Sequence, residues 1–238
     1  MGDKMMTMSK NSSVSSPQPV SRKEQGEATR QLLLTTAEQL IAEQGMAQVS
    51  MRHIVEAAGI GNNSALKYHI GNRVDLVRAI IRRHGEPIAA RTRELSEQVR
   101  DSDDPRDHVA SFIRPHIEHL AELGNPSWQA RFIAQVDVDP VLRDEILTGT
   151  LVQVPRYDTW SGVPELPPAE EALRSRALRM VVLHTCAAEE RLAASTGVPA
   201  DWPMIGEALI DAVTGMLTAP RHPRNAHSEP TANEGNSP

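Results

Sequence analysis

The residues whose types and spacing best suit chemistry lie between positions 59 and 69. Gly59 and Gly61 form a tight turn after one short predicted helix, and a second helix follows from about 62 to 69. Hydrogen-bonding side chains dominate this second helix: Asn62, Asn63, Ser64, Lys67, Tyr68 and His69. Asn can pair with adenine through two hydrogen bonds, Lys can reach guanine or phosphate, and Ser and Tyr hydroxyls hold phosphate oxygens. The segment therefore predicts a surface that recognises double-stranded DNA.

A polar face on a lone helix would be explained more simply by contact with water, but the surroundings of this helix favour nucleic acid. Three helices within about 45 residues, two of them short and joined by a glycine turn, are typical of a helix-turn-helix unit. Residues 1–84 carry 11 Lys and Arg against 7 Asp and Glu, a net charge of +4, whereas residues 85–238 carry a net charge of -10. The basic part attracts phosphate, and the acidic part repels it.

A second cluster, His116 and His119, suggests a metal site. The two side chains fall on one helical face at i and i+3, and His108 is a candidate third ligand. The alternative is a solvated helix face that carries histidines by chance. Cys186 has apolar neighbours, which favours an inert buried thiol. We expect no catalytic site, no metal and no cofactor, so the protein is predicted not to be an enzyme.

The scarce large aromatic side chains are the natural markers of a small-molecule pocket. The candidate effector-binding residues combine aromatic rings with two histidines as polar anchors: Phe112, His116, Trp128, Phe132, Trp160 and His184. The competing interpretation is that most of these rings are ordinary core residues. No motif in the acidic part identifies the ligand, so apolar, cationic and acyl-type effectors all stay open.

The pattern of apolar residues predicts an all-α fold, because period-3.6 segments recur and no alternating strand pattern is found. Helices are expected at 26–44, 51–58, 62–69, 74–99, 106–123, 127–136, 140–154, 169–195 and 202–218, with Gly85 and Pro87 bending or splitting the fourth. The predicted organisation is a disordered tail at 1–21, a helix-turn-helix domain at 22–73, a larger helical effector-binding and dimerisation domain at 74–218, and a disordered tail at 219–238. The last two helices are the most amphipathic, and a pair from each of two chains would form a four-helix homodimer interface.

The chain of 238 residues has one cysteine and no apolar run long enough to cross a bilayer. Its first 20 residues lack the apolar core of a signal peptide. These features predict a cytoplasmic location without a membrane partner.

The stretch from Thr29 to Ile81 resembles the DNA-binding domain of the tetracycline-repressor (TetR) family. Several blocks match in order and spacing: residues 37–45 (AEQLIAEQG), 49–54 (VSMRHI), 57–60 (AAGI), 68–73 (YHIGNR) and 75–76 (DL). The resemblance is to the subgroup with Asn-x-Ser-Ala before Tyr-His. It departs from the commonest pattern at Gly61, usually Ser, and at Ile70, usually Phe, and its turn is one residue longer.

This resemblance implies an all-helical homodimer whose N-terminal unit reads the major groove and whose C-terminal domain binds a small effector. By position, Ser50, Met51 and Arg52 begin the helix that abuts the DNA backbone. The recognition helix spans Asn62 to Tyr68, His69 closes it, and Arg73 stands where a phosphate-touching Lys is usual. The favoured interpretation is a repressor that an effector releases from a palindromic operator. A transcriptional activator of the same fold and a helical metal-dependent enzyme using His116 and His119 are the alternatives.

Overall fold

The computed structural model describes residues 21–61, 68–143 and 160–220, and every regular element in these ranges is an α-helix. The described helices are α1 (Arg22–Gln44), α2 (Met51–Ala57), α4 (Arg73–Gln98), α5 (Pro105–Leu123), α6 (Gln129–Val138), α8 (Pro168–Thr196) and α9 (Trp202–Thr218). The predicted all-α class is confirmed. The helices predicted around 62–69 and 140–154, and both predicted tails, fall wholly or mainly outside the described residues. The domain boundaries stay predictions.

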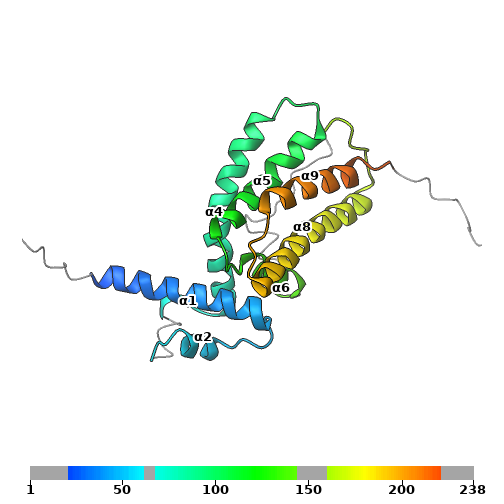
Figure 1. The fold of residues 1–238 in the computed structure, drawn as a ribbon. Coiled ribbons are helices and arrows are strands. Elements are labelled where there is room, and N and C mark those ends of the chain that lie inside the picture. The colour runs from blue at the N-terminus through cyan, green and yellow to red at the C-terminus, as the bar shows by residue number, and fades with distance from the viewer. Residues whose placement is uncertain (1–20, 62–67, 144–159, 221–238) are drawn as a thin grey trace, which may run out of the picture.

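α1 and α2 form one end of the molecule, and α5, α8 and α9 form the other (Figure 1). α4 runs from the α1–α2 end along α5 toward the far end. None of the described helices is both long enough and apolar enough to span a membrane.

α4 is a single unbroken helix, so of the bend or split expected at Gly85 and Pro87 the split is wrong, and the bend stays a prediction. Pro87 is exposed, and the hydrogen bond that it cannot donate is lost on a face that water reaches. Gly85 and His84 are buried on the other face, where α4 packs against α5. Tertiary packing on that face therefore holds the helix together across the proline.

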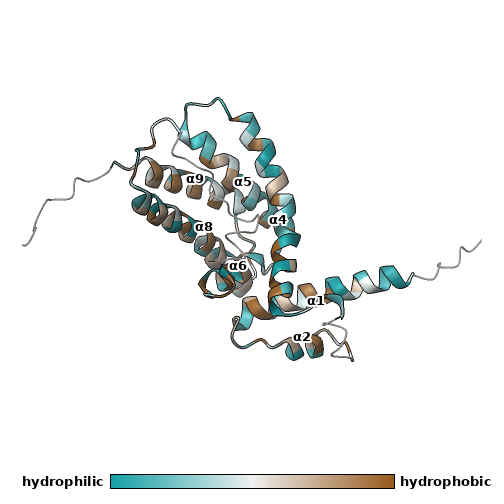
Figure 2. Cartoon of the chain, turned by 180° about the vertical axis from the view of Figure 1, so that it is seen from behind, coloured by the Kyte–Doolittle hydropathy of each residue, from teal (hydrophilic) through white to brown (hydrophobic). Residues whose placement is uncertain are grey.

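The first hydrophobic core contains residues of the N-terminal helices and of helices that come much later in the chain. Leu33, Leu34 and Ile41 of α1 pack with Ile54 of α2 and with the first half of α4. The same cluster contains Phe132, Ile133 and Val136 of α6 and Leu183 of α8. In Figure 2 apolar residues gather where α1 meets its neighbours, whereas the free end of α1 is hydrophilic. The core of the N-terminal helices is thus continuous with the C-terminal helices.

A second core fills the far end. It is built from α5 and α9, which lie side by side, with contributions from α6 and α8. Ile205, Leu209 and Val213 of α9 are buried in it, which accounts for most of the apolar stripe of that helix. Gly206 permits this packing, because a Cβ there would lie 3.0 Å from a side-chain carbon of Ile117.

A buried carboxylate connects α8 to the start of α6. Glu190 Oε1 accepts hydrogen bonds from Ser127 Oγ (2.8 Å) and Ala130 N (3.3 Å), and Oε2 accepts them from Arg131 N (2.9 Å) and Nε (3.1 Å). The side chain of Glu190 is 2% exposed and that of Arg131 is 8% exposed. Trp128, the residue before α6, makes no side-chain cap, so Glu190 satisfies N–H groups that a local cap would otherwise take.

We predict that Glu190→Ala lowers the free energy of unfolding by about 3–5 kcal/mol, because it leaves the Arg131 guanidinium and the α6 amides without their acceptor. Glu190→Gln keeps an acceptor oxygen and should cost less. Urea denaturation followed by circular dichroism measures both, with Glu189→Ala on the same turn of α8 as the control. Equal stability of Glu190→Ala and wild type would contradict the capping role.

Candidate nucleic-acid interface

The start of α2 is held by a conventional cap. Ser50 is the N-cap, and its Oγ accepts a hydrogen bond from the backbone N of His53 (3.1 Å). Met51 is half-buried, so part of its side chain packs against the first core and part stays accessible. Arg52 is exposed, and its Nε donates to Glu56 Oε1 (2.6 Å) one turn later. Of these three predicted contact residues, Arg52 presents the most side chain to a ligand.

Tyr68 and His69 lie at the end of the predicted recognition helix. Tyr68 is 85% exposed, an unusual position for a large aromatic side chain, and its ring meets the His69 ring edge to face at 4.9 Å. The Tyr68 hydroxyl is therefore free to meet an external partner. The other predicted base-reading residues, Asn62, Asn63, Ser64 and Lys67, lie outside the described residues.

Arg73 has a structural role that sequence reasoning missed. Its Nη1 donates to the Val49 carbonyl (2.7 Å), and its Nη2 donates to the Met46 carbonyl. These bonds connect the start of α4 to the loop between α1 and α2. No local sequence pattern predicts these two hydrogen bonds, because Val49 and Met46 are 24 and 27 residues away from Arg73. A phosphate contact at Arg73 stays a prediction, and the guanidinium would have to make it in addition to these bonds.

The geometry of the turn before α4 requires the residue types Gly71 and Asn72. Gly71 has φ +107, and a Cβ there would lie 2.5 Å from Asp75 Oδ2. Asn72 Oδ1 accepts from Val74 N (2.8 Å) and Asp75 N (3.1 Å), and Asp75 Oδ2 accepts from Asn72 N (3.1 Å). This reciprocal capping box sets the direction in which the predicted recognition helix leads into α4.

The six candidate effector residues do not line one cavity among the described residues. Phe132 is fully buried in the first core, and Phe112 packs against the second core. Trp128 and Trp160 line two different pockets. His184 Nε2 is buried, 3.7 Å from Asp137 Oδ2, without a hydrogen bond. Their roles in ligand binding stay predictions.

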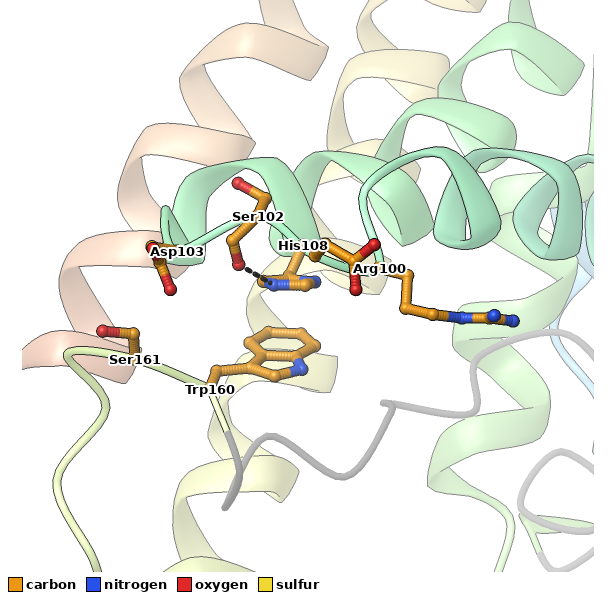
Figure 3. A pocket seen from close by; sticks show the side chains of 7 residues that line it. Arg100, Ser102, Asp103, His108, Trp160 and Ser161 are labelled. Atoms are coloured by element: carbon orange, nitrogen blue, oxygen red, sulfur yellow. Dashed lines mark hydrogen bonds between the residues drawn. The ribbon is translucent and has the colours of Figure 1, made fainter.

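One pocket, here called the loop pocket, lies beside the α4–α5 connection and has a volume of about 430 Å³. Its lining is polar: Arg100, Asp101, Ser102, Asp103, His108, Trp160 and Ser161. The His108 and Trp160 rings are stacked, with centroids 4.8 Å apart (Figure 3). His108 Nε2 donates to the Ser102 carbonyl (2.8 Å). His108 is thus committed to this pocket and does not join the other two histidines as a third metal ligand.

The second pocket, here called the junction cleft, lies where α1, α4 and α5 meet and has a volume of about 300 Å³. Its lining is mixed: Thr35, Glu38, Arg83, His84, His119, Leu123, Pro126, Ser127 and Trp128. Within the described ranges, no group of three or more His, Cys, Asp or Glu side chains could hold a metal ion.

His116 lies one turn before His119 and is 4% exposed. Both of its ring nitrogens are buried without a hydrogen-bond partner. Burial, together with the neighbouring His119 and His84, lowers the pKa of His116 to about 4. His116 is therefore a neutral side chain at pH 7.

The N-terminal helices are similar to a known protein family. Residues 33–80 match the model of the bacterial regulatory proteins of the tetR family. The match covers α1 from Leu33, α2 and the first turns of α4, which are the elements that the resemblance identified. The predicted resemblance to this family is confirmed, and the chain is a DNA-binding transcriptional regulator with an N-terminal helix-turn-helix domain.

Two solved structures are similar to the chain at 20% sequence identity. One is NalD, the secondary repressor of the MexAB-OprM multidrug efflux pump in Pseudomonas aeruginosa, with a TM-score of 0.47 over 82% of this chain and 98% of NalD. The other is PfmR, a TetR family transcriptional regulator from Thermus thermophilus, with a TM-score of 0.33 over 80% of this chain and 85% of PfmR. No curated protein matches the sequence significantly. Because both TM-scores are below 0.5, the assignment rests on residues 33–80.

We predict that His116→Leu makes stability less dependent on pH. In the unfolded chain a histidine takes up a proton below about pH 6.5, whereas native His116 resists protonation down to a pKa of about 4. Its contribution to stability is therefore complete above pH 6.5 and decreases as the pH falls to about 4, by roughly 3 kcal/mol.

Thermal and urea unfolding at several pH values between 7 and 4 measure the effect. The variant should lose less stability over this interval than wild type, since leucine has a similar volume and no proton to bind. Parallel profiles for the two proteins would show that His116 is not the group responsible.

Proposed function

We propose that the chain is a homodimeric repressor that binds a palindromic operator through its N-terminal helices and is released by a small-molecule effector. The observation that carries the proposal is the match of residues 33–80 to the tetR family, within which the side chains of Arg52 and Tyr68 are exposed. Two recognition helices related by a twofold axis would enter successive major grooves. The proposed DNA contacts are Ser50, Met51, Arg52, Asn62, Asn63, Ser64, Lys67, Tyr68, His69 and Arg73.

The charge distribution supports this orientation. Arg52 and Tyr68 are exposed at the end of the molecule that α1 and α2 form, within the part of the sequence that carries a net positive charge. The acidic remainder repels phosphate, so the protein is expected to approach DNA with its N-terminal helices first.

Exposed apolar side chains on α8 support a dimer through the last two helices. Leu173 is 62% exposed and Met180 is 47% exposed, two turns apart on one face. Ala208 and Ala212 are exposed on α9. Apolar stripes of this kind on packed helices are typical of an interface between subunits.

The effector belongs to the same proposal, with Phe112, His116, Trp128, Phe132, Trp160 and His184 as candidate contacts. An effector releases DNA only if it binds more tightly to the conformer in which the recognition helices are wrongly spaced. A transcriptional activator of the same fold stays the alternative. We also propose a cytoplasmic location, where the protein meets its operator.

The test is selection of sheared DNA from the source genome with purified protein at near-physiological salt, followed by sequencing. Recovery of one inverted repeat is the expected result. Uniform recovery would contradict sequence-specific regulation.

We predict that Arg52→Ala weakens operator binding about equally for all sequences. The plot of log affinity against log salt concentration should also become less steep, by about 1 unit of slope. The reason is the loss of one phosphate-neutralising charge. Fluorescence anisotropy at several salt concentrations measures it, with Arg93→Ala, an exposed arginine on α4, as the control. An unchanged slope would remove Arg52 from the interface.

We predict that Met180→Glu shifts the protein toward monomer, because it places a charge in the proposed apolar interface. Analytical ultracentrifugation measures the dissociation constant. Leu32→Glu, a substitution at a 47% exposed residue of α1, is the control and should leave the dimer intact. A stable Met180→Glu dimer would exclude this face of α8.

A further inference from the structure

A chain of polar contacts crosses the three helices that meet at the junction cleft. Glu38 of α1 is 3% exposed, and its two carboxylate oxygens accept hydrogen bonds from different groups of α4. Arg83 Nη2 donates to Oε2, and His84 Nε2 donates to Oε1 (2.9 Å). His84 Nδ1 in turn lies 2.8 Å from His119 Nε2 of α5. The order of contacts is carboxylate, imidazole, imidazole.

This order determines what His119 presents to the cleft. Because a carboxylate only accepts, His84 Nε2 carries a proton, and in a neutral His84 ring Nδ1 is then the acceptor for His119 Nε2. Burial, the nearby His84 and the Arg83 charge lower the pKa of His119 to about 4, against the opposing effect of Glu38. At pH 7 the His119 ring is neutral, and its Nδ1 holds a lone pair. No group in the described part of the chain donates to this nitrogen.

The charged groups of the cleft are already committed to each other. Arg83 donates to Glu38 and, through Nη1, to Thr35 Oγ1 (3.0 Å). Glu38 has a partner at each oxygen. An anionic ligand would have to compete with Glu38 for Arg83, and a cationic ligand would have to compete with Arg83 for Glu38. The ligand that meets no such competition is uncharged and donates one hydrogen bond to His119.

Part of the lining of the junction cleft is apolar and aromatic. Leu123, Pro126 and Trp128 form it, and Leu123 is 36% exposed. Trp128 Nε1 donates to Glu43 Oε1 of α1 (3.1 Å), which orients the indole and uses its only donor. A volume of about 300 Å³ is at the small end of ligand pockets. This part of the lining suits one aromatic ring.

We propose that the junction cleft binds a small phenol, whose hydroxyl donates to His119 Nδ1 and whose ring packs against Trp128 and Leu123. A phenolic hydroxyl is more acidic than an aliphatic one and is therefore the stronger donor to imidazole.

Binding at this cleft also has a consequence for regulation, which rests on the proposed function. The cleft is bounded by α1, which carries the N-terminal helices, and by α5, which belongs to the second core. A phenol between them favours one relative placement of α1 and α5, so it shifts the position of the helices proposed to bind DNA.

The binding test uses the indole N–H signals of the three tryptophans in ¹⁵N-labelled full-length protein, assigned with Trp128→Phe and Trp160→Phe variants. The probe is 4-ethylphenol, and the matched control is its methyl ether, which cannot donate. We expect a saturable shift of the Trp128 signal with 4-ethylphenol and at least about tenfold weaker binding of the ether. Trp160, in the loop pocket, should not respond. No saturable shift at Trp128, or equal binding of phenol and ether, would overturn the proposal.

Two variants separate the hydroxyl contact from the apolar contact. His119→Phe should remove the preference for phenol over ether, and Leu123→Asp, at an exposed edge of the cleft, should weaken both ligands. The unchanged Trp202 signal verifies that each variant is folded. A retained preference in His119→Phe would also overturn the proposal.

The regulatory consequence is tested separately with the DNA recovered by selection. In fluorescence anisotropy, 4-ethylphenol should weaken DNA binding at least about tenfold and the ether should not. An unchanged affinity for DNA when 4-ethylphenol is bound would overturn the regulatory role of the cleft. Failure to bind any DNA would overturn the proposed function, whereas the indole titration would still decide whether the cleft binds phenols.

Discussion

The apolar face of α1 has to be covered from two directions, by α2 and α4 and by α6, and this requirement decides how the other helices are arranged. Leu33, Leu34 and Ile41 contact α2 and the first half of α4 in a cluster that also contains Phe132 and Ile133 of α6. Removing this much apolar surface from water is the dominant favourable contribution to folding. Because the helices proposed to bind DNA share a close-packed core with α6, they cannot shift without repacking it. A change in the packing of α6 would therefore alter the contacts of α1.

Glu190 and Glu38 are two of the buried carboxylates near this core, and their partners come from distant parts of the chain. Glu190 of α8 caps α6, and Glu38 of α1 pairs with Arg83 and His84 of α4. A buried charge is tolerated only when it is paired and hydrogen-bonded. The two sites differ in surroundings, since Glu190 is enclosed by protein whereas Glu38 borders a cleft. The first suits a fixed connection, and the second suits a connection that a ligand can alter.

A regulator that responds to a small molecule needs an element with two arrangements of similar free energy. Close-packed apolar cores have few such alternatives, whereas a hydrogen-bond chain through histidines can rearrange by moving a proton or turning a ring. In this protein the chain through Glu38, His84 and His119 connects α1, α4 and α5. The buried and unpartnered His116 beside it adds a side chain that gains from any new polar neighbour.

The helical elements and the similarity of the N-terminal unit to the tetR family follow from local sequence patterns. Caps such as Ser50 and the Gly71-Asn72 pair, and the apolar period of each helix, are local properties, so the predicted limits of α5, α8 and α9 lie within one residue of those observed. Tertiary structure alone decided that α4 continues through Pro87, that Arg73 binds carbonyls of the preceding loop, and that His84 rather than His108 joins His119. Each of these depends on residues far apart in the chain, and the spacing of residues within one helix does not encode which side chains from other helices will face it. For the same reason the aromatic residues singled out for one pocket are divided between two pockets and two cores.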